Sequence, residues 1–109
     1  MIYELRTYWA NPGKLDDLLN RFRTLTMGIF ERRGMEVVGF WTPQEETEKS
    51  GSLVYLMRFE SVEAMQAAWA GFRVDEEWVI GKAATEVNGM LTARVLSIVM
   101  DPTDFSPMQ

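Results

Sequence analysis

Met1–Trp9 read MIYELRTYW, a run in which polar and apolar side chains alternate. Successive residues of a β-strand point to opposite faces of its sheet. One face of this strand therefore carries Glu4, Arg6 and Tyr8, whereas the other carries mainly apolar side chains. Later strands show the same alternation, so the sequence predicts a sheet with one apolar face and one mixed face that still contains much apolar surface.

The remaining chain alternates between strand and helix patterns. Strands are expected at residues 1–9, 35–42, 53–60 and 90–100, and helices at 14–33, after Ser61, and again from Asp75. The helices are read from apolar residues that recur every three or four positions. The order βαββαβ is that of the ferredoxin-like split βαβ fold, an α+β architecture whose four-stranded antiparallel sheet carries the helices on one face. Right-handed crossovers place the first and third strands at the centre.

Local signals define the ends of these elements. Asn11 suits a helix N-cap and Pro12 the first helical position. Gly34 suits a left-handed C-terminal cap. Gly28 lies within the first helix, where glycine costs about 1 kcal/mol, and a close approach between helix and sheet would explain it. Gly39 predicts a bulge or a close neighbour within its strand.

Composition narrows the classes of function. The 109 residues suit one domain, 1–109, with residues 101–109 as a C-terminal tail. The absence of cysteine and histidine removes disulfides, thiolate chemistry, and the commonest general base and metal ligand, so we expect no metal and no cofactor. A net charge of −5 argues against nucleic acid.

The expected location is the cytoplasm. The first strand begins at Ile2, which leaves no room for a signal peptide. No run approaches the roughly 20 apolar residues of a membrane span.

The uncovered face of the sheet predicts self-association. Helices on one side leave the other side with six large side chains, namely Ile2, Tyr8, Val54, Leu56, Leu96 and Ile98. So much contiguous apolar surface is unusual for a monomer. We therefore expect a symmetric homodimer that stacks sheet on sheet.

A set of short motifs runs through the chain in a fixed order. They are IYELRTY (2–8) with Pro12-Gly13, VGFW (38–41), LVYL (53–56), WAGF (69–72) with Asp75 and Trp78, and PTDFSP (102–107). This set resembles the NIPSNAP family over nearly the whole chain. The resemblance implies the dimeric α+β barrel superfamily, in which two ferredoxin-like halves enclose a cavity. Family members often carry histidines along the first helix, where Leu25 and Arg33 stand here.

Five polar residues are candidates for a binding site. If they share the mixed face of adjacent strands, Glu4, Arg6, Tyr8, Arg58 and Arg94 converge inside the barrel or at its rim. Buried charges are costly unless they are paired or serve a ligand. One interpretation is a pocket for a small polar or anionic molecule, in which an arginine binds a carboxylate or enolate and Tyr8 or Glu4 relays a proton. The alternative is a cross-strand ion network of Glu4 with Arg58 or Arg94.

The aromatic residues and the tail extend this hypothesis. Trp69 and Trp78 have the spacing of core residues, whereas Trp41, at the end of a strand, suits the mouth of a cavity. The tail could gate that mouth, strap across a partner subunit, or be disordered.

Two function classes remain open. One is a ligand-binding homodimer without turnover, and the other is a small cofactor-independent enzyme, a monooxygenase or isomerase by the resemblance.

Overall fold

A computed structural model describes residues 1–109. The elements, in order, are β1 (Ile2–Ala10), α1 (Leu15–Arg21), η1 (Phe22–Thr26), α2 (Met27–Arg32), β2 (Glu36–Trp41), β3 (Leu53–Phe59), α3 (Val62–Val74), α4 (Glu76–Thr85) and β4 (Thr92–Met100). The segments α1, η1 and α2 form one continuous helix, because the junction residues Phe22 and Met27 keep helical backbone angles. The turn η1 in its middle is a π-helix.

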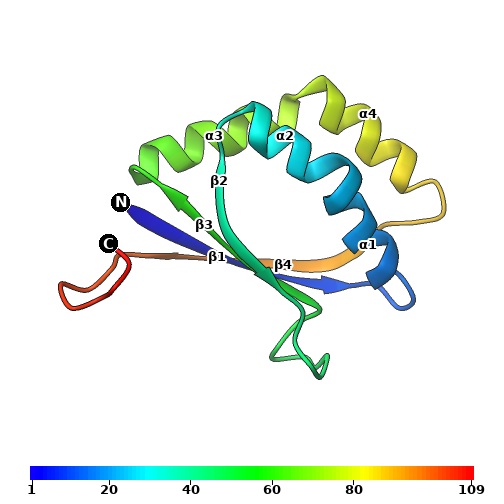
Figure 1. The fold of residues 1–109 in the computed structure, drawn as a ribbon. Coiled ribbons are helices and arrows are strands. Elements are labelled where there is room, and N and C mark those ends of the chain that lie inside the picture. Colours follow the sequence, from blue (N-terminus) through cyan, green and yellow to red (C-terminus); the bar gives the residue numbers. More distant parts are fainter.

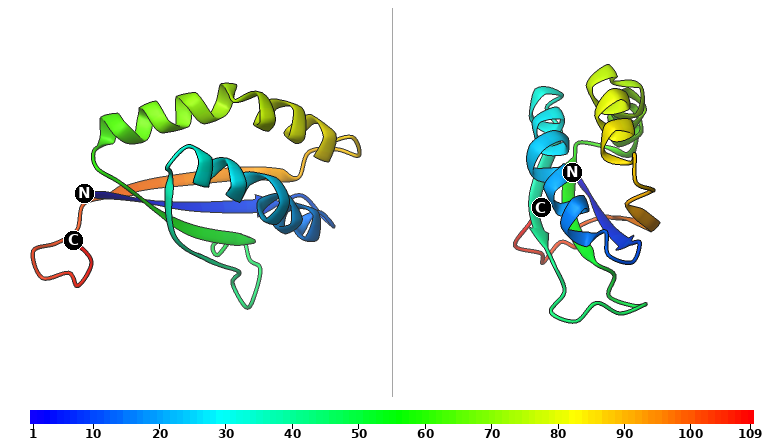
Figure 2. Two further views of the ribbon diagram at one scale, coloured as in Figure 1. Left: turned by 45° about the horizontal axis from the view of Figure 1, so that its top comes forward. Right: turned by 90° about the vertical axis from the view of Figure 1, so that its right-hand side faces the viewer.

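The four strands form one antiparallel sheet in the order β2-β3-β1-β4. The two helical segments, α1 to α2 and α3 to α4, lie on the same side of this sheet (Figures 1 and 2). The prediction of a ferredoxin-like α+β fold with the first and third strands at the centre is therefore confirmed. None of the helices combines the length and apolar character that a membrane crossing requires.

The strand register decides which side chains meet the helices. Arg6 pairs with Tyr55 of β3 and with Ser97 of β4, so these three residues share one face. This is the helix-facing side, because Tyr55 is completely buried in the core. Ile2 and Tyr8 lie on this same side and pack in or against the core. Their predicted place on the uncovered face was wrong, because alternation separates two faces without saying which of them the helices cover.

We call the opposite side of the sheet the bare face. It is the side to which Leu5 points, and the register places six large apolar or aromatic side chains there, among others: Tyr3, Leu5, Val54, Leu56, Leu96 and Ile98. The tail, residues 101–109, folds against one end of this face, where the Tyr3 hydroxyl donates to the Gln109 carbonyl at 3.1 Å. The β2–β3 loop lies at the other end, where the Trp9 indole donates to the Glu48 carbonyl at 2.8 Å. Between them the face has no covering element.

Most predicted helix and strand ends are confirmed. The Ser61 side chain accepts from the Ala64 amide at the start of α3. Gly34 follows α2 with a φ of 68°. Gly39 marks a register shift in β2, and a Cβ there would lie 2.8 Å from the Trp41 ring.

Two local predictions were wrong. Asn11 does not cap the first helix, which begins at Leu15; its side-chain amide instead donates to the Met90 carbonyl at 2.9 Å and ties β1 to the segment before β4. Gly28 is exposed, and nothing lies within 4 Å of the place where its Cβ would be. No close approach to the sheet therefore requires a glycine at that position.

Candidate functional site

The sheet separates the six candidate residues into two groups. Glu4, Arg6 and Tyr8 lie on the helix-facing side, as their pairing with the core strand β3 requires. Trp41, Arg58 and Arg94 lie on the bare face. Their pairing partners across the strands are Val54, Tyr3 and Trp9, and all three partners point away from the helices. The predicted convergence of Glu4, Arg6 and Tyr8 with Arg58 and Arg94 was therefore wrong. Alternation within each strand does not fix the register between strands, and the register decides which face Arg58 and Arg94 share with β1.

The three bare-face residues have structural contacts of their own. Arg58 lies 3.7 Å from Glu36 of the neighbouring strand. The guanidinium of Arg94 stacks 4.4 Å from the centre of the Trp9 ring. Trp41 is 55% exposed at the end of β2. The alternative of an ion network joining Glu4 to Arg58 or Arg94 was also wrong, because the sheet lies between them.

Glu4 is a buried carboxylate, 2% exposed, that accepts three hydrogen bonds. The Trp69 indole donates to it at 2.6 Å, the Ser97 hydroxyl at 2.5 Å and the Arg6 guanidinium at 3.0 Å. Trp69 belongs to α3 and Ser97 to β4, so Glu4 joins β1 to both elements. Buried charge is stable here because it is paired and fully hydrogen-bonded.

Arg6 also donates to two tyrosines. Its Nε donates to the Tyr55 hydroxyl at 2.9 Å and its Nη2 to the Tyr8 hydroxyl at 3.1 Å, while the two hydroxyls lie 2.8 Å apart. Burial lowers the pKa of Arg6, but Tyr55, Tyr8 and Glu4 outweigh that effect, so its pKa is raised above the ordinary value. Arg6 therefore stays charged. Its guanidinium lies 4.1 Å from the centre of the Trp69 ring.

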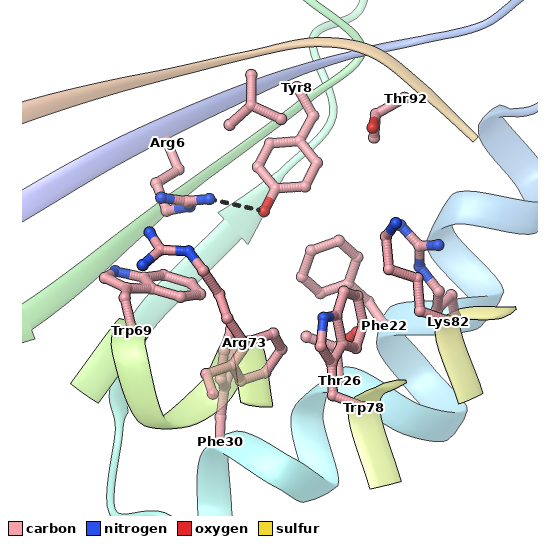
Figure 3. A pocket seen from close by; sticks show the side chains of 13 residues that line it. Arg6, Tyr8, Phe22, Thr26, Phe30, Trp69, Arg73, Trp78, Lys82 and Thr92 are labelled. Carbon is pink, nitrogen blue, oxygen red and sulfur yellow. Dashed lines mark hydrogen bonds between the residues drawn. The ribbon is translucent and has the colours of Figure 1, made fainter. Parts of the chain in front are cut away.

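A cavity of about 200 Å³ opens beside this network, between the sheet and the helices. Figure 3 shows its lining side chains, which come from both helical segments and from strands β1 and β4. The lining residues are Arg6, Tyr8, Arg21, Phe22, Thr26, Phe30, Trp69, Phe72, Arg73, Trp78, Lys82, Thr92 and Val95. Trp41 and the C-terminal tail do not line this cavity; Trp41 lines a different pocket, together with Phe40 and Leu53. Their roles at the mouth of a cavity in the dimer stay predictions.

The charges of the cavity wall are all positive. Four lining residues are cationic, Arg6, Arg21, Arg73 and Lys82, and none is a carboxylate. Glu4 pairs with Arg6, and Glu86 pairs with Arg21 at 3.2 Å and Lys82 at 3.2 Å. Arg73 forms no ion pair. In Figure 3 the Arg73 guanidinium points toward that of Arg6. The wall thus carries more positive charge than its neighbouring carboxylates balance.

The π-helical turn η1 contributes an unsatisfied polar group to the wall. Thr26 is 3% exposed, and its hydroxyl has no hydrogen-bond partner. Two residues earlier, the Thr24 hydroxyl makes the usual bond to the carbonyl four residues back, Asn20, at 2.9 Å. Isolated π-helical turns occur frequently at functional sites. A buried hydroxyl without a partner is costly unless something in the cavity meets it.

Sequence reasoning missed the cations that the helices contribute. A signal was present, because each lies at a helical step from an apolar core position. Arg21 lies three residues after Leu18, whereas Arg73 and Lys82 lie four residues after Trp69 and Trp78. A charge within an apolar helical stripe indicates either a buried pair or a cavity.

The fold and this cavity define a class: a ferredoxin-like α+β protein with a ligand-sized, positively charged cavity between sheet and helices. The chain belongs to the NIPSNAP family, whose family model matches residues 3–107. No protein with a curated description matches it.

Solved structures agree with this assignment. An uncharacterized NIPSNAP domain protein from Burkholderia xenovorans is 22% identical, with 98% of this chain and 99% of that one covered and a TM-score of 0.81. A NIPSNAP family protein from Agrobacterium tumefaciens is 20% identical, with 99% and 98% covered and a TM-score of 0.83. A more distant structure, an antibiotic biosynthesis monooxygenase, is 13% identical, with 94% and 99% covered and a TM-score of 0.63. At these identities the likeness shows a shared fold.

Proposed function

We propose that this NIPSNAP family protein binds a small organic anion in the cavity between its sheet and helices, and that it does so as a homodimer. The observation that carries the first part is the set of four cations around a cavity wall without a carboxylate. A wall with more cations than carboxylates attracts an anion, and hydrogen bonds from guanidinium groups to that anion are charge-assisted and strong. Arg73 is exposed and has no acidic partner, so it can bind an anion without first breaking an ion pair.

The size and lining of the cavity limit the ligand. Pockets for drug-sized molecules measure roughly 300–1,000 Å³, so a volume of about 200 Å³ suits a single ring or a short chain. Aromatic side chains make up much of the wall, namely Tyr8, Phe22, Phe30, Trp69, Phe72 and Trp78. These favour a ligand with an apolar or flat body next to its charged group.

A panel of small organic anions tests the ligand proposal by thermal shift and titration calorimetry. We expect Arg73→Gln to weaken binding of the anions that stabilise the wild type. A charge-assisted hydrogen bond is worth about 1.5–3 kcal/mol, so the loss is about 10- to 100-fold in affinity. Lys49→Gln is the matched control, because it removes one exposed positive charge far from the cavity and leaves affinity unchanged. Equal losses in both variants would show only a general charge effect and would refute the proposal.

The bare face supports the homodimer. Ile98 is 44% exposed and Leu96 is 38% exposed on β4, and Trp41 extends the apolar surface at the opposite edge. A second copy brings an identical apolar surface, which is the self-complementarity that a two-fold interface needs. We assign Trp41, Arg58 and Arg94 to this interface and Glu4, Arg6 and Tyr8 to the ligand site.

An enzyme of the monooxygenase or isomerase type is the second candidate. The specific observation in its favour is the convergence of Arg6 and Tyr8 on one side of the cavity, since such donors stabilise a developing oxyanion such as an enolate. The similarly folded antibiotic biosynthesis monooxygenase raises the same possibility by analogy. Oxygen consumption with each anion that binds tests the monooxygenase, and chromatography of the recovered ligand tests the isomerase. Turnover that Tyr8→Phe abolishes would favour the enzyme over the binding protein.

A further inference from the structure

The hydroxyl oxygens of Tyr8 and Tyr55 lie 2.8 Å apart, and counting hydrogens decides which one donates. Each hydroxyl has a single hydrogen and can accept from other donors. Both oxygens already accept an N–H of Arg6, Tyr55 at 2.9 Å and Tyr8 at 3.1 Å. Tyr55 is fully buried and does not line the cavity. The Tyr8 oxygen is therefore the one acceptor available to the Tyr55 hydrogen.

The opposite direction would leave the Tyr55 hydrogen buried without an acceptor, which is unfavourable. Burial and the neighbouring Tyr8 raise the pKa of Tyr55 well above its ordinary value, so Tyr55 keeps its hydrogen at neutral pH. It follows that the Tyr8 oxygen accepts from both Arg6 and Tyr55. The hydrogen of Tyr8 then has no acceptor in the protein, and Tyr8 is the one of the two tyrosines that lines the cavity.

We propose that the Tyr8 hydroxyl donates this hydrogen to an oxygen of the bound ligand, and that the ligand is a planar carboxylate or enolate. This inference rests on the proposed function, since it requires that an anion binds in the cavity. Arg6 lines the same part of the wall and uses only one hydrogen each of Nη1 and Nη2. A hydroxyl beside a guanidinium suits an oxygen that carries negative charge. The aromatic wall suits a flat body attached to that oxygen.

Glu4 does not compete with Tyr8 for this role. Its Oε1 accepts from Trp69 and its Oε2 from Ser97 and Arg6, and it is not part of the cavity wall. Glu4 is a positioning residue, which holds Arg6 and through it orients the tyrosine pair. Glu4 and Tyr8 are the two groups on β1 that could donate a proton to a ligand. Only Tyr8 lines the cavity, so the geometry selects Tyr8.

Titration of the wild type and of Tyr8→Phe with three probes tests the proposal. The probes are benzoate as a planar carboxylate, benzamide as its neutral analogue, and inorganic phosphate as a tetrahedral anion. We expect benzoate to bind more tightly than the other two. We expect Tyr8→Phe to weaken benzoate about 10-fold or more. Benzamide should lose less affinity, because a hydrogen bond to a neutral carbonyl oxygen is weaker than one to a carboxylate. Arg73→Gln shows whether a probe binds within the cavity, because Arg73 lines it and its loss should weaken only binding there.

The possible failures are distinguishable. If none of the probes binds at millimolar concentration, the proposed function fails together with this inference. If benzoate binds and Arg73→Gln weakens it while Tyr8→Phe does not, the anion site stands and the role of Tyr8 is refuted. If phosphate binds more tightly than benzoate, the planar class is refuted.

A measurement on the wild type guards against a variant that does not fold. The chain has three tyrosines, so labelling their ζ carbons with ¹³C gives three NMR signals. Benzoate should shift the Tyr8 signal most, because the Tyr8 hydroxyl gains the ligand as a hydrogen-bond acceptor. Tyr3 lies on the bare face and serves as the internal control. A larger shift at Tyr55 than at Tyr8 would reverse the assigned direction of the hydrogen bond and overturn the proposal.

Discussion

Replacing Glu4 by glutamine tests the buried network on which the candidate site depends. Glu4 accepts three hydrogen bonds at 2.5–3.0 Å and is the one carboxylate paired with Arg6. Glutamine keeps the shape but offers one acceptor oxygen instead of two, and its NH₂ group faces a donor. The variant leaves Arg6 charged without its counter-ion, because the raised pKa of Arg6 prevents deprotonation.

The expected loss follows from this arrangement. Removing one partner of a buried ion pair costs about 3–5 kcal/mol. For a domain of this size, each kcal/mol lowers the melting temperature by about 4–8 °C. We therefore expect Glu4→Gln to melt at least about 12 °C below the wild type. Far-UV circular dichroism in a urea series gives the free energy of unfolding, at one fixed protein concentration because association changes the apparent stability.

Glu77→Gln is the matched control. Glu77 lies on α4, away from the bare face, and pairs with Arg32 at 3.4 Å with its side chain 56% exposed. Exposed pairs are worth about 0–1 kcal/mol, so this variant should melt close to the wild type. A loss below about 1 kcal/mol in Glu4→Gln, with an unchanged urea dependence, would refute the view that Glu4 organises the network.

Two further substitutions probe the helical layer. Gly28→Ala should stabilise the protein by about 0.5–1 kcal/mol, because alanine is the better helix former and the site is open; a lower urea midpoint would contradict this. Asp75 caps α4 and binds Arg32 at 2.7 Å, and Arg32, followed by Arg33, lowers the pKa of Asp75 to about 2 from its ordinary 3.8. A lowered folded-state pKa contributes stability that is fully present above about pH 4 and is lost as the pH falls toward 2. Urea unfolding from pH 5 to pH 2 should therefore show wild type and Asp75→Asn converging as the pH falls, and a constant difference would contradict this pairing.

The period-two pattern was sufficient to predict the sheet and its order. Leu53, Tyr55, Met57 and Phe59 alternate strictly along β3, and all four are buried. The same pattern could not say which face meets the helices, because both faces of β1 carry large side chains. That decision depends on register across three strands, and a shift of one residue reverses it.

The candidate site was predictable only in part. Glu4, Arg6 and Tyr8 stood out because polar side chains alternate through a central strand. Arg58 and Arg94 looked equivalent to them until pairing with β1 placed both on the bare face. The cations from the helices were missed because a helical stripe was read for its apolar members alone. The π-helical turn at Phe22–Thr26 has no pattern in this sequence that we can name.

We propose that one face of the sheet serves the ligand and that a second copy of the chain covers the other, the bare face. Light scattering at micromolar concentration tests that division most directly. We expect the wild type to have twice the 12.6 kDa mass of one chain. Ile98→Arg on the bare face should reduce it to a single-chain mass, whereas Ile80→Arg, 62% exposed on α4, should leave the dimer intact. A wild type that scatters as one chain, or a dimer that Ile98→Arg does not affect, would contradict a homodimer formed through the bare face.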